Sequence, residues 1–422
     1  MRAHSRAVLL LAFVAAKAAA QGIPPVRPLG PIISVCSANA LGSVSYVRPL
    51  PNGDVLVHDL TRRQVVLLDR KLALKSVIAD ANGASTGGYT SQVAGLIPYR
   101  GDSSLFVDPQ ALTMTVLDDK GATIRVMAIP RPQDANNMIG GPFGTPGVDP
   151  AGRIIYRGIA TPNRRNASGG PPEPGQPFRM PQPPDTAPLL RVDLVTRRTD
   201  TVAFLKIPAM TFHVSETERG FLTVVKTNPL PTVDDWALLP DGRIAVIRGR
   251  DFHVEFLQTD GRLVSSPKVS YAWERLSDED KQRVADSATV QWQIERAAIE
   301  SRVNGDTSAS GQSAGSAERS RPGATRRFQG PNMESFAAKE LPDYRPAFKQ
   351  GVASVDGAGN LWIRTTAPSD AGPIYDLVNS NGVLIDRVKV PFGRVISGFG
   401  DGVVYLGVLD ERWAVLEVAR VR

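Results

Sequence analysis

The chain has 422 residues, 49 of them basic and 42 acidic, which gives a formal charge of +7, and it holds a single cysteine. One cysteine excludes a disulfide-stabilised scaffold, so stability must come from packing. The charge is mild and the arginine pairs are scattered without interleaved aromatic residues, so we expect no nucleic-acid partner.

The first 20 residues are typical of an export signal. Arg2 and Arg6 give a basic start, residues 7–16 form an apolar run, and alanines at 18–20 offer a small-residue cleavage site. We expect residues 1–20 to be removed near Gln21, which takes away three basic residues and lowers the formal charge from +7 to +4. The apolar run is about half the roughly 20 residues that span a membrane, and no later segment spans one. The sequence therefore predicts an exported protein, either periplasmic or secreted.

A short phrase of turn residues followed by an apolar strand recurs along the chain. It stands at 51–57, 149–155, 240–246 and 356–362, with looser copies at 100–107 and 400–406. Most copies lie about 40 to 50 residues apart, which is the period of a four-stranded propeller blade. A second strand and often a second turn follow each phrase, as in antiparallel meanders. The repeat predicts an all-β, six-bladed β-propeller.

The repeat also predicts where each blade lies and how the ring closes. The expected blades span residues 43–80, 90–130, 145–208, 232–270, 351–391 and 393–422. The last unit has only three strands, and residues 31–36 would supply the fourth from the other end of the chain. Such a strand closes the ring without leaving an open sheet edge. Cys36 would then be a small buried side chain rather than a reactive thiol.

Two stretches are longer than the period and are interpreted as insertions. The first is the Pro-rich segment 161–188, and the second runs from 271 to 350 between the fourth and fifth blades. Residues 277–280, Ser-Asp-Glu-Asp, are typical of a capped helix start, and apolar residues at helical spacing predict a helix to about Val303. Residues 304–330 are rich in Ser, Gly, Ala and Arg, and we expect them to be disordered.

Three passages carry a resemblance to a known family. They are DDWALLPDGR at 234–243 with FHVEF at 252–256, LPDYRPAF at 341–348 ahead of GNLW at 359–362, and GFGDGVVY from 398 onward. In these passages the chain resembles the secreted bacterial six-bladed β-propeller proteins related to the NHL and TolB-like repeat families. The resemblance implies the architecture and export, but no activity, because this fold hosts enzymes and binders alike.

Five residues are candidates for ligand contact because the turn phrases align them at the ends of the second strands. They are His58, Asp108, Arg157, Arg248 and Arg364. Loops after second strands and loops entering the next blade open on one face, where binding sites are often built. The three arginines would form a broken basic ring suited to bidentate contact with a carboxylate, phosphate or sulfate. The alternative is that they pair with neighbouring acids or end their strands in water.

A metal-dependent hydrolase of the lactonase type is the alternative function. Its ligands at the mouth of the central channel would be Asp149, Asp235 and Asp356, which we expect near the starts of innermost strands. Ca²⁺ would be the metal, although it prefers about six to eight oxygen ligands. No spacing of cysteine and histidine residues indicates a zinc site.

Both insertions would leave from the face that carries the ligand-contact candidates. The sequence therefore favours a monomeric, non-catalytic propeller that binds a small anionic ligand, a glycan or a protein partner on this face. It does not name the ligand, and it assigns no cofactor outside the hydrolase alternative.

Overall fold

The computed structural model describes most of the chain. The described residues are 22–36, 41–81, 87–161, 182–217, 220–309, 332–409 and 414–422. The expected export signal, most of the Pro-rich insertion and residues 310–330 lie outside the described residues.

The fold is mostly β. In the described part of the chain the strands form seven sheets, six of which contain a four-stranded antiparallel meander. Sheet 1 consists of β3 (Tyr46–Pro49), β4 (Val55–Asp59), β5 (Gln64–Leu68), β6 (Leu74–Asp80) and the short parallel β7 (Gly87–Gly88). Sheet 2 consists of β8 (Gly95–Pro98), β9 (Ser104–Asp108), β10 (Thr113–Leu117) and β11 (Thr123–Ala128). Sheet 3 consists of β12 (Gly147–Val148), β13 (Arg153–Arg157), β14 (Thr186–Asp193) and β15 (Thr199–Lys206). Sheet 4 consists of β18 (Asp235–Leu238), β19 (Ile244–Arg248), β20 (His253–Leu257) and β21 (Leu263–Lys268). Sheet 5 contains β23 (Phe348–Val355), β24 (Leu361–Thr365), β25 (Ile374–Val378) and β26 (Leu384–Lys389). Sheet 6 consists of β27 (Arg394–Gly400), β28 (Val403–Leu409), β29 (Ala414–Arg420) and β2 (Ile32–Val35).

The recurring phrases form the turns between the first and second strands of these sheets. Gly152 has φ 81° and Gly242 has φ 86°, a left-handed conformation that glycine adopts without steric cost. In each case the glycine amide donates a hydrogen bond back across the turn, from Gly152 to the Asp149 carbonyl and from Gly242 to the Leu239 carbonyl. The phrase recurs in the sequence because the same turn, with a glycine in the left-handed conformation, recurs in the backbone.

The six meanders are arranged as a ring. First strands of neighbouring sheets contact one another, as β8 does β12, β18 does β23, and β27 does β3, so the first strands are innermost. Six clusters of buried apolar side chains each join two consecutive sheets, and one of them joins sheet 6 back to sheet 1. Between sheets 3 and 4, for example, Ile155 and Leu189 pack with Trp236. Fully burying one large apolar side chain contributes about 1.5–3 kcal/mol, so stability comes from these interfaces. This arrangement is that of a β-propeller.

The N-terminal segment contributes to two sheets. β2 pairs antiparallel with β29 and supplies the fourth strand of sheet 6, as the sequence predicts. Cys36 is buried beside it, and its Sγ lies 3.4 Å from the Leu72 carbonyl oxygen. The sequence did not predict β1 (Val26–Pro28), which pairs in parallel with β26 at the outer edge of sheet 5.

The ring has two rims that differ in their connections. Innermost strands begin at one rim, here called the insertion rim, and they end at the other, the turn rim, where the recurring phrases lie. The insertion rim is marked by the first residues of the innermost strands, Tyr46, Gly95, Gly147, Asp235, Phe348 and Arg394. Because each four-stranded meander starts and ends at the same rim, the connections from sheet to sheet also lie on the insertion rim.

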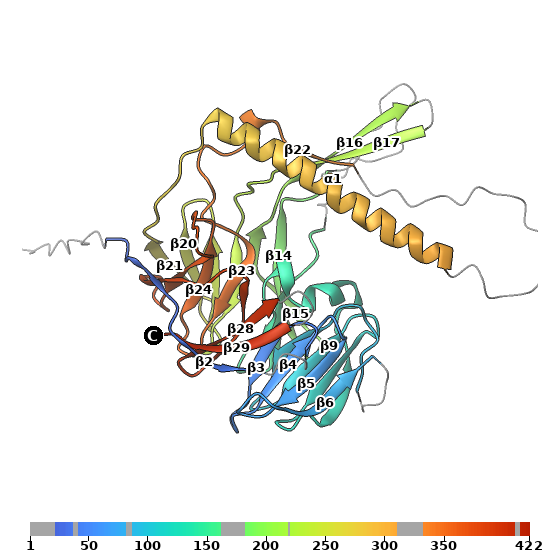
Figure 1. Cartoon of the computed structure of the whole chain (residues 1–422), viewed down its shortest axis with the longest axis vertical. Coiled ribbons are helices and arrows are strands. Elements are labelled where there is room, and N and C mark those ends of the chain that lie inside the picture. The colour runs from blue at the N-terminus through green and yellow to red at the C-terminus, as the bar shows by residue number, and fades with distance from the viewer. Residues whose placement is uncertain are drawn as a thin grey trace, which may run out of the picture.

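Several of these connections are folded. The connection from sheet 3 to sheet 4 forms the hairpin of β16 (Met210–Thr217) and β17 (Gly220–Thr227). The connection from sheet 4 to sheet 5 contains α1 (Asp278–Ala309), β22 (Asn332–Ser335) and the 3-10 helix η4 (Ala338–Glu340). β22 pairs in parallel with β17, and α1 packs on β22 and η4. Figure 1 shows α1 and the hairpin together, beyond the edge of the sheets. We call this unit, the hairpin with α1, β22 and η4, the accessory module.

α1 differs from the prediction at its end. It starts where the sequence predicts, but it continues past Val303 to Ala309, so residues 304–309 are helical rather than disordered. Extending an existing helix adds one hydrogen bond for each residue fixed, so poor helix formers such as Gly305 need not stop it.

Candidate functional site

The five predicted ligand-contact residues all lie at the insertion-rim ends of second strands. Asp108, Arg157 and Arg248 are the last residues of β9, β13 and β19, while His58 and Arg364 are the penultimate residues of β4 and β24. The aligned phrases therefore placed them on the expected strands. Their surroundings differ greatly from one sheet to the next.

His58 and Asp108 are buried and already hydrogen-bonded. His58 Nε2 lies 2.8 Å from the Tyr89 hydroxyl, and burial lowers the pKa of His58 to about 4, against the opposing effect of Asp59. The Asp108 carboxylate accepts hydrogen bonds from the Thr90 amide at 2.7 Å and the Thr90 hydroxyl at 2.9 Å. Both side chains hold loops in place, so contact with a ligand would require these bonds to break.

Arg248 is engaged by two acids. Its guanidinium lies 2.7 Å from an Asp234 oxygen and 2.6 Å from a Glu255 oxygen, and it also donates to the Phe204 carbonyl. Two carboxylates balance its single charge. At this position the structure therefore has the alternative that the sequence left open, an arginine paired with acids, and the turn phrases do not reveal which acids these are.

Arg157 and Asp235 form a buried polar pair. Asp235 Oδ2 accepts hydrogen bonds from the Val352 and Ala353 amides, both at 2.9 Å, at an irregular stretch of β23. Burial raises the pKa of Asp235 to about 6 although these amide bonds lower it. Burial also lowers the pKa of Arg157 to about 10, and the Asp235 carboxylate acts in the opposite direction. Asp235 Oδ1 and Arg157 Nε are buried, and neither has a hydrogen-bond partner among the described residues.

A short helix covers this pair. The 3-10 helix η2 (Gly141–Phe143) lies in the connection between sheets 2 and 3, yet it packs on β23 of sheet 5. The Trp236 indole donates to the Phe143 carbonyl at 3.0 Å, and the Arg157 guanidinium lies 4.4 Å from the centre of the Phe143 ring. Gly351 is required here because a Cβ would stand 2.6 Å from the Gly141 carbonyl oxygen. The loop thus lies over the innermost strands at the insertion rim.

Arg364 is the exposed member of the five. It lies on β24 among buried neighbours, and its own side chain faces solvent. No ion pair or hydrogen bond of its guanidinium is found within the described part of the chain. Of the predicted basic ring, the structure therefore leaves one arginine open at the insertion rim.

The three predicted metal ligands do not converge. Asp149 and Asp356 follow the ends of the innermost strands β12 and β23, at the turn rim, whereas Asp235 begins β18 at the insertion rim. This corrects the expectation that all three lie near strand starts, because the turn phrase comes after the innermost strand. Asp149 binds Arg153, with the two side chains 2.7 Å apart, and Asp356 accepts the Asn360 amide and the Trp362 indole. Across the described ranges, no group of three or more His, Cys, Asp or Glu side chains is placed to hold a metal ion.

The accessory module is the part of the insertion rim that sequence reasoning did not foresee as one unit. Residues 209–231 belonged to no predicted blade, and the run of β-branched and aromatic residues in Phe221–Val225 was the available signal for a strand. The start of α1 is fixed by ion pairs to residues just before sheet 5. Lys281 is buried and its Nζ lies 2.6 Å from an Asp343 oxygen, and Arg345 makes a two-pronged contact with Glu274.

Within the ranges that the structure describes, no helix combines the length and apolar character needed to cross a bilayer.

Comparisons with known proteins give structural likeness only. No protein-family model and no curated protein matches the chain. Among solved structures, a gluconolactonase from Xanthomonas campestris is 12% identical, with 93% of this chain and 99% of that chain covered and a TM-score of 0.39. A virginiamycin B lyase from Staphylococcus aureus is 9% identical, with coverages of 92% and 98% and a TM-score of 0.39. A member of the DUF4221 family from Bacteroides vulgatus is 10% identical, with coverages of 94% and 97% and a TM-score of 0.45.

Proposed function

We propose that the protein is an exported, non-catalytic six-bladed β-propeller that binds a ligand or a protein partner on the insertion rim. In this proposal residues 1–20 are a cleaved signal, and the chain is a relative of the secreted NHL and TolB-like propellers. The six meanders are the six blades, within residues 43–80, 90–130, 145–208, 232–270, 351–391 and 393–422 with 31–36.

One observation carries the proposal. Two connections that are far apart in the sequence pair with each other on the same rim, through the parallel contact of β17 with β22. α1 packs on β22 of this pair rather than extending as a loose insertion. Long connections gathered on one side of a rigid scaffold are where binding sites tend to be built, and here they form an ordered platform.

The surface of this platform suits a protein partner. Val290 and Ile294 are 55% and 58% exposed, and their four-residue spacing puts them on one side of α1. Trp273 and Tyr344 are also exposed, near the start of α1. Large aromatic side chains are enriched in protein interfaces, where they can bury much apolar area. Arg364 adds an open cation at the same rim for an acidic group.

The hydrolase remains a second candidate because of Asp235. A carboxyl group with a pKa of about 6 can exchange a proton near neutral pH, and perturbed carboxyl groups are common at catalytic sites. Against this, Asp149 and Asp356 lie at the opposite rim and cannot share a Ca²⁺ ion with Asp235. Any Ca²⁺ site would need oxygen ligands other than the predicted set.

Variants of α1 test the proposal on the full chain. Immobilised protein would be exposed to the exported fraction of the source cells, and bound proteins would be quantified by mass spectrometry. We expect a captured partner to be reduced at least about tenfold by Val290→Ser with Ile294→Ser, since losing buried apolar contact of this size costs more than 1.4 kcal/mol. Gln293→Ser, on the same helix and also exposed, should leave capture unchanged.

Three measurements on the same purified protein distinguish a hydrolase from a non-catalytic binding protein. Metal content, the effect of EDTA on the melting temperature, and lactone hydrolysis would be measured for the wild type and for Asp235→Asn. A bound divalent metal whose removal lowers the melting temperature, with hydrolysis abolished in D235N, would overturn the non-catalytic proposal. If the wild type, the double variant of Val290 and Ile294, and Gln293→Ser all capture the partner equally, the accessory module is not the binding surface.

A further inference from the structure

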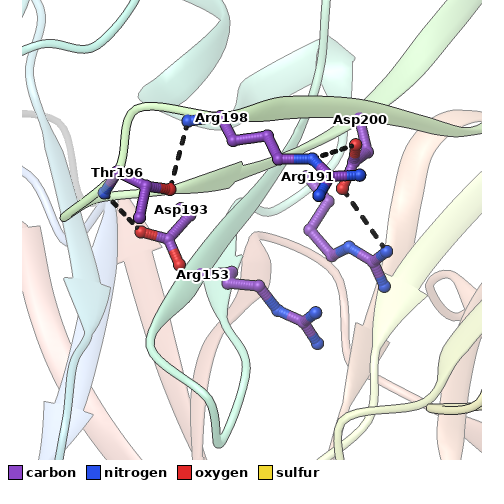
Figure 2. Close-up of a pocket in the computed structure, with 6 residues that line it drawn as sticks. All are labelled: Arg153, Arg191, Asp193, Thr196, Arg198 and Asp200. Atoms are coloured by element: carbon purple, nitrogen blue, oxygen red, sulfur yellow. Dashed lines mark hydrogen bonds and ion pairs between the residues drawn. The ribbon is translucent and has the colours of Figure 1, made fainter.

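A hollow at the turn rim of sheet 3 lies on the opposite side of the molecule from the accessory module. It has a volume of about 500 Å³ and opens between the ends of β13, β14 and β15. It is lined by Arg153, Arg191, Asp193, Thr196, Arg198 and Asp200, which Figure 2 shows as sticks.

The strand register places these residues on one face of the sheet. Arg191 is paired with Ile155 on β13 and with Asp200 on β15. Side chains of directly paired residues point to the same face, and Ile155 packs against sheet 4. The hollow therefore continues the interface between sheets 3 and 4 outward to the rim, where arginines replace the apolar residues.

The acids of the hollow are already committed. Asp193 accepts hydrogen bonds from the Thr196 and Val195 amides at 2.7 and 2.9 Å, and these bonds hold the pKa of Asp193 below its usual range. Asp200 accepts a hydrogen bond from Arg198 Nε at 3.2 Å. Arg153 is held by Asp149, outside the hollow, at 2.7 Å.

Arg191 forms a long ion pair with Asp200, and one of its buried donors has no acceptor among the described residues. Its guanidinium lies 3.7 Å from the nearest Asp200 oxygen, too far for a hydrogen bond. Its Nε is buried and has no hydrogen-bond partner in the described part of the chain. A buried donor without an acceptor is costly and rare in native proteins, so we expect a bound ligand to supply the acceptor.

We propose that this hollow binds an oxyanion, the carboxylate, phosphate or sulfate group of a small molecule. Arg191 supplies a planar pair of donors that matches such a group, and Arg198 and Arg153 stand on either side of it (Figure 2). Asp200 competes with the anion for Arg191 and Arg198. This site is independent of the insertion rim and of the function proposed there.

Calorimetric titration of the full chain tests the site. The probes are inorganic phosphate, inorganic sulfate and glucuronate, each at an ionic strength held constant with sodium chloride. We expect saturable binding of at least one probe, and the strongest probe shows whether a tetrahedral or a planar anion is preferred. Arg191→Gln should weaken that binding about tenfold or more, because charge-assisted hydrogen bonds to Arg are lost. Asp200→Asn should strengthen it several-fold, because the competing carboxylate is gone.

Arg262→Gln is the matched control. Arg262 occupies the corresponding outer turn of sheet 4, where it is 72% exposed and 3.8 Å from Asp260, and it does not line the hollow. The Arg262→Gln variant should bind the probes with the same affinity as the wild type. If Arg191→Gln does not fold, the anion affinity of Asp200→Asn still tests the proposal. Absence of saturable binding, or binding that neither Arg191→Gln nor Asp200→Asn changes, would overturn the proposal.

Discussion

Single residues in this protein take their properties from what covers them. Asp235 and Asp356 are both aspartates beside an innermost strand, yet Asp356 bonds its own turn while Asp235 is buried beneath a loop from another sheet. Removing a carboxylate from water disfavours its charged form, and two amide hydrogen bonds do not restore the usual pKa. Asp235 therefore stays protonated to a higher pH in the folded chain than an exposed aspartate does.

The pH dependence of stability follows from this pKa. The pKa of Asp235 is about 6 in the folded chain and 3.8 when the group is exposed. Between these values the folded state holds more protons than the unfolded state, so the free energy of unfolding falls as pH rises from about 4 to about 6. The difference corresponds to roughly 3 kcal/mol, which stays lost at higher pH.

Asp235→Asn cannot ionise and so isolates this contribution. We expect the free energy of unfolding of the wild type to fall by about 3 kcal/mol relative to D235N between about pH 4 and pH 7. Urea unfolding at a series of pH values measures it, with Asp241→Asn, an exposed carboxylate in the turn of the same sheet, as the control. A difference that does not vary with pH would show that Asp235 is not protonated near neutral pH in the fold.

At the scale of elements, α1 shows how far local signals extend. Ser277 and Asp280 form a reciprocal cap at the predicted helix start: the Asp280 amide donates to Ser277 Oγ and the Ser277 amide donates to an Asp280 oxygen, both at 3.1 Å. Such a cap depends only on residues three apart, so the start of the helix was predictable. Its packing on β22 was not, because β22 lies beyond the helix in the chain and pairs with a hairpin more than 100 residues earlier.

Removing the cap should loosen the first turn of α1. Ser277→Ala deletes the side-chain acceptor for the Asp280 amide, which costs about 1 kcal/mol at a helix start. We expect amide hydrogen exchange in the first turn to become about fivefold faster. Ser287→Ala, at an exposed position within the same helix, should not speed exchange, because alanine is the better helix former there. Equal exchange in S277A and the wild type would mean that tertiary contacts, not the cap, hold this turn.

At the scale of the whole molecule, the N-terminal segment joins the ends of the ring. β2 completes sheet 6, β1 lies along sheet 5, and Arg27 bonds both Asp386 and the Val421 carbonyl. Without β2, the edge of β29 would present unpaired backbone groups, which favour aggregation.

Truncation tests this closure. A chain beginning at Ser37 should be less stable than one beginning at Pro31 by about 3 kcal/mol or more, because it loses the hydrogen bonds of a whole strand and the buried Cys36. Thermal melting and light scattering of the two purified chains would measure the loss and the aggregation. Both chains lack β1 and Arg27, so these do not enter the difference. If both melt alike without scattering, the ring is held by the interfaces between sheets alone.

The sequence by itself determined the repeating part of this protein. Each turn phrase needs a left-handed glycine, each second strand ends five to seven residues later, and the helix cap lies within three residues, so these features are local. A three-stranded last unit also implied a fourth strand from the N-terminus.

Only the tertiary structure decided which polar groups remain open. It paired Arg248 with Asp234 and Glu255, laid η2 over Arg157 and Asp235, and left Arg191 Nε without an acceptor among the described residues. The physical reason is that burial and ion pairing depend on neighbouring sheets and on connections that cross the ring. Those groups come from distant parts of the chain, and no short pattern of residues records their approach.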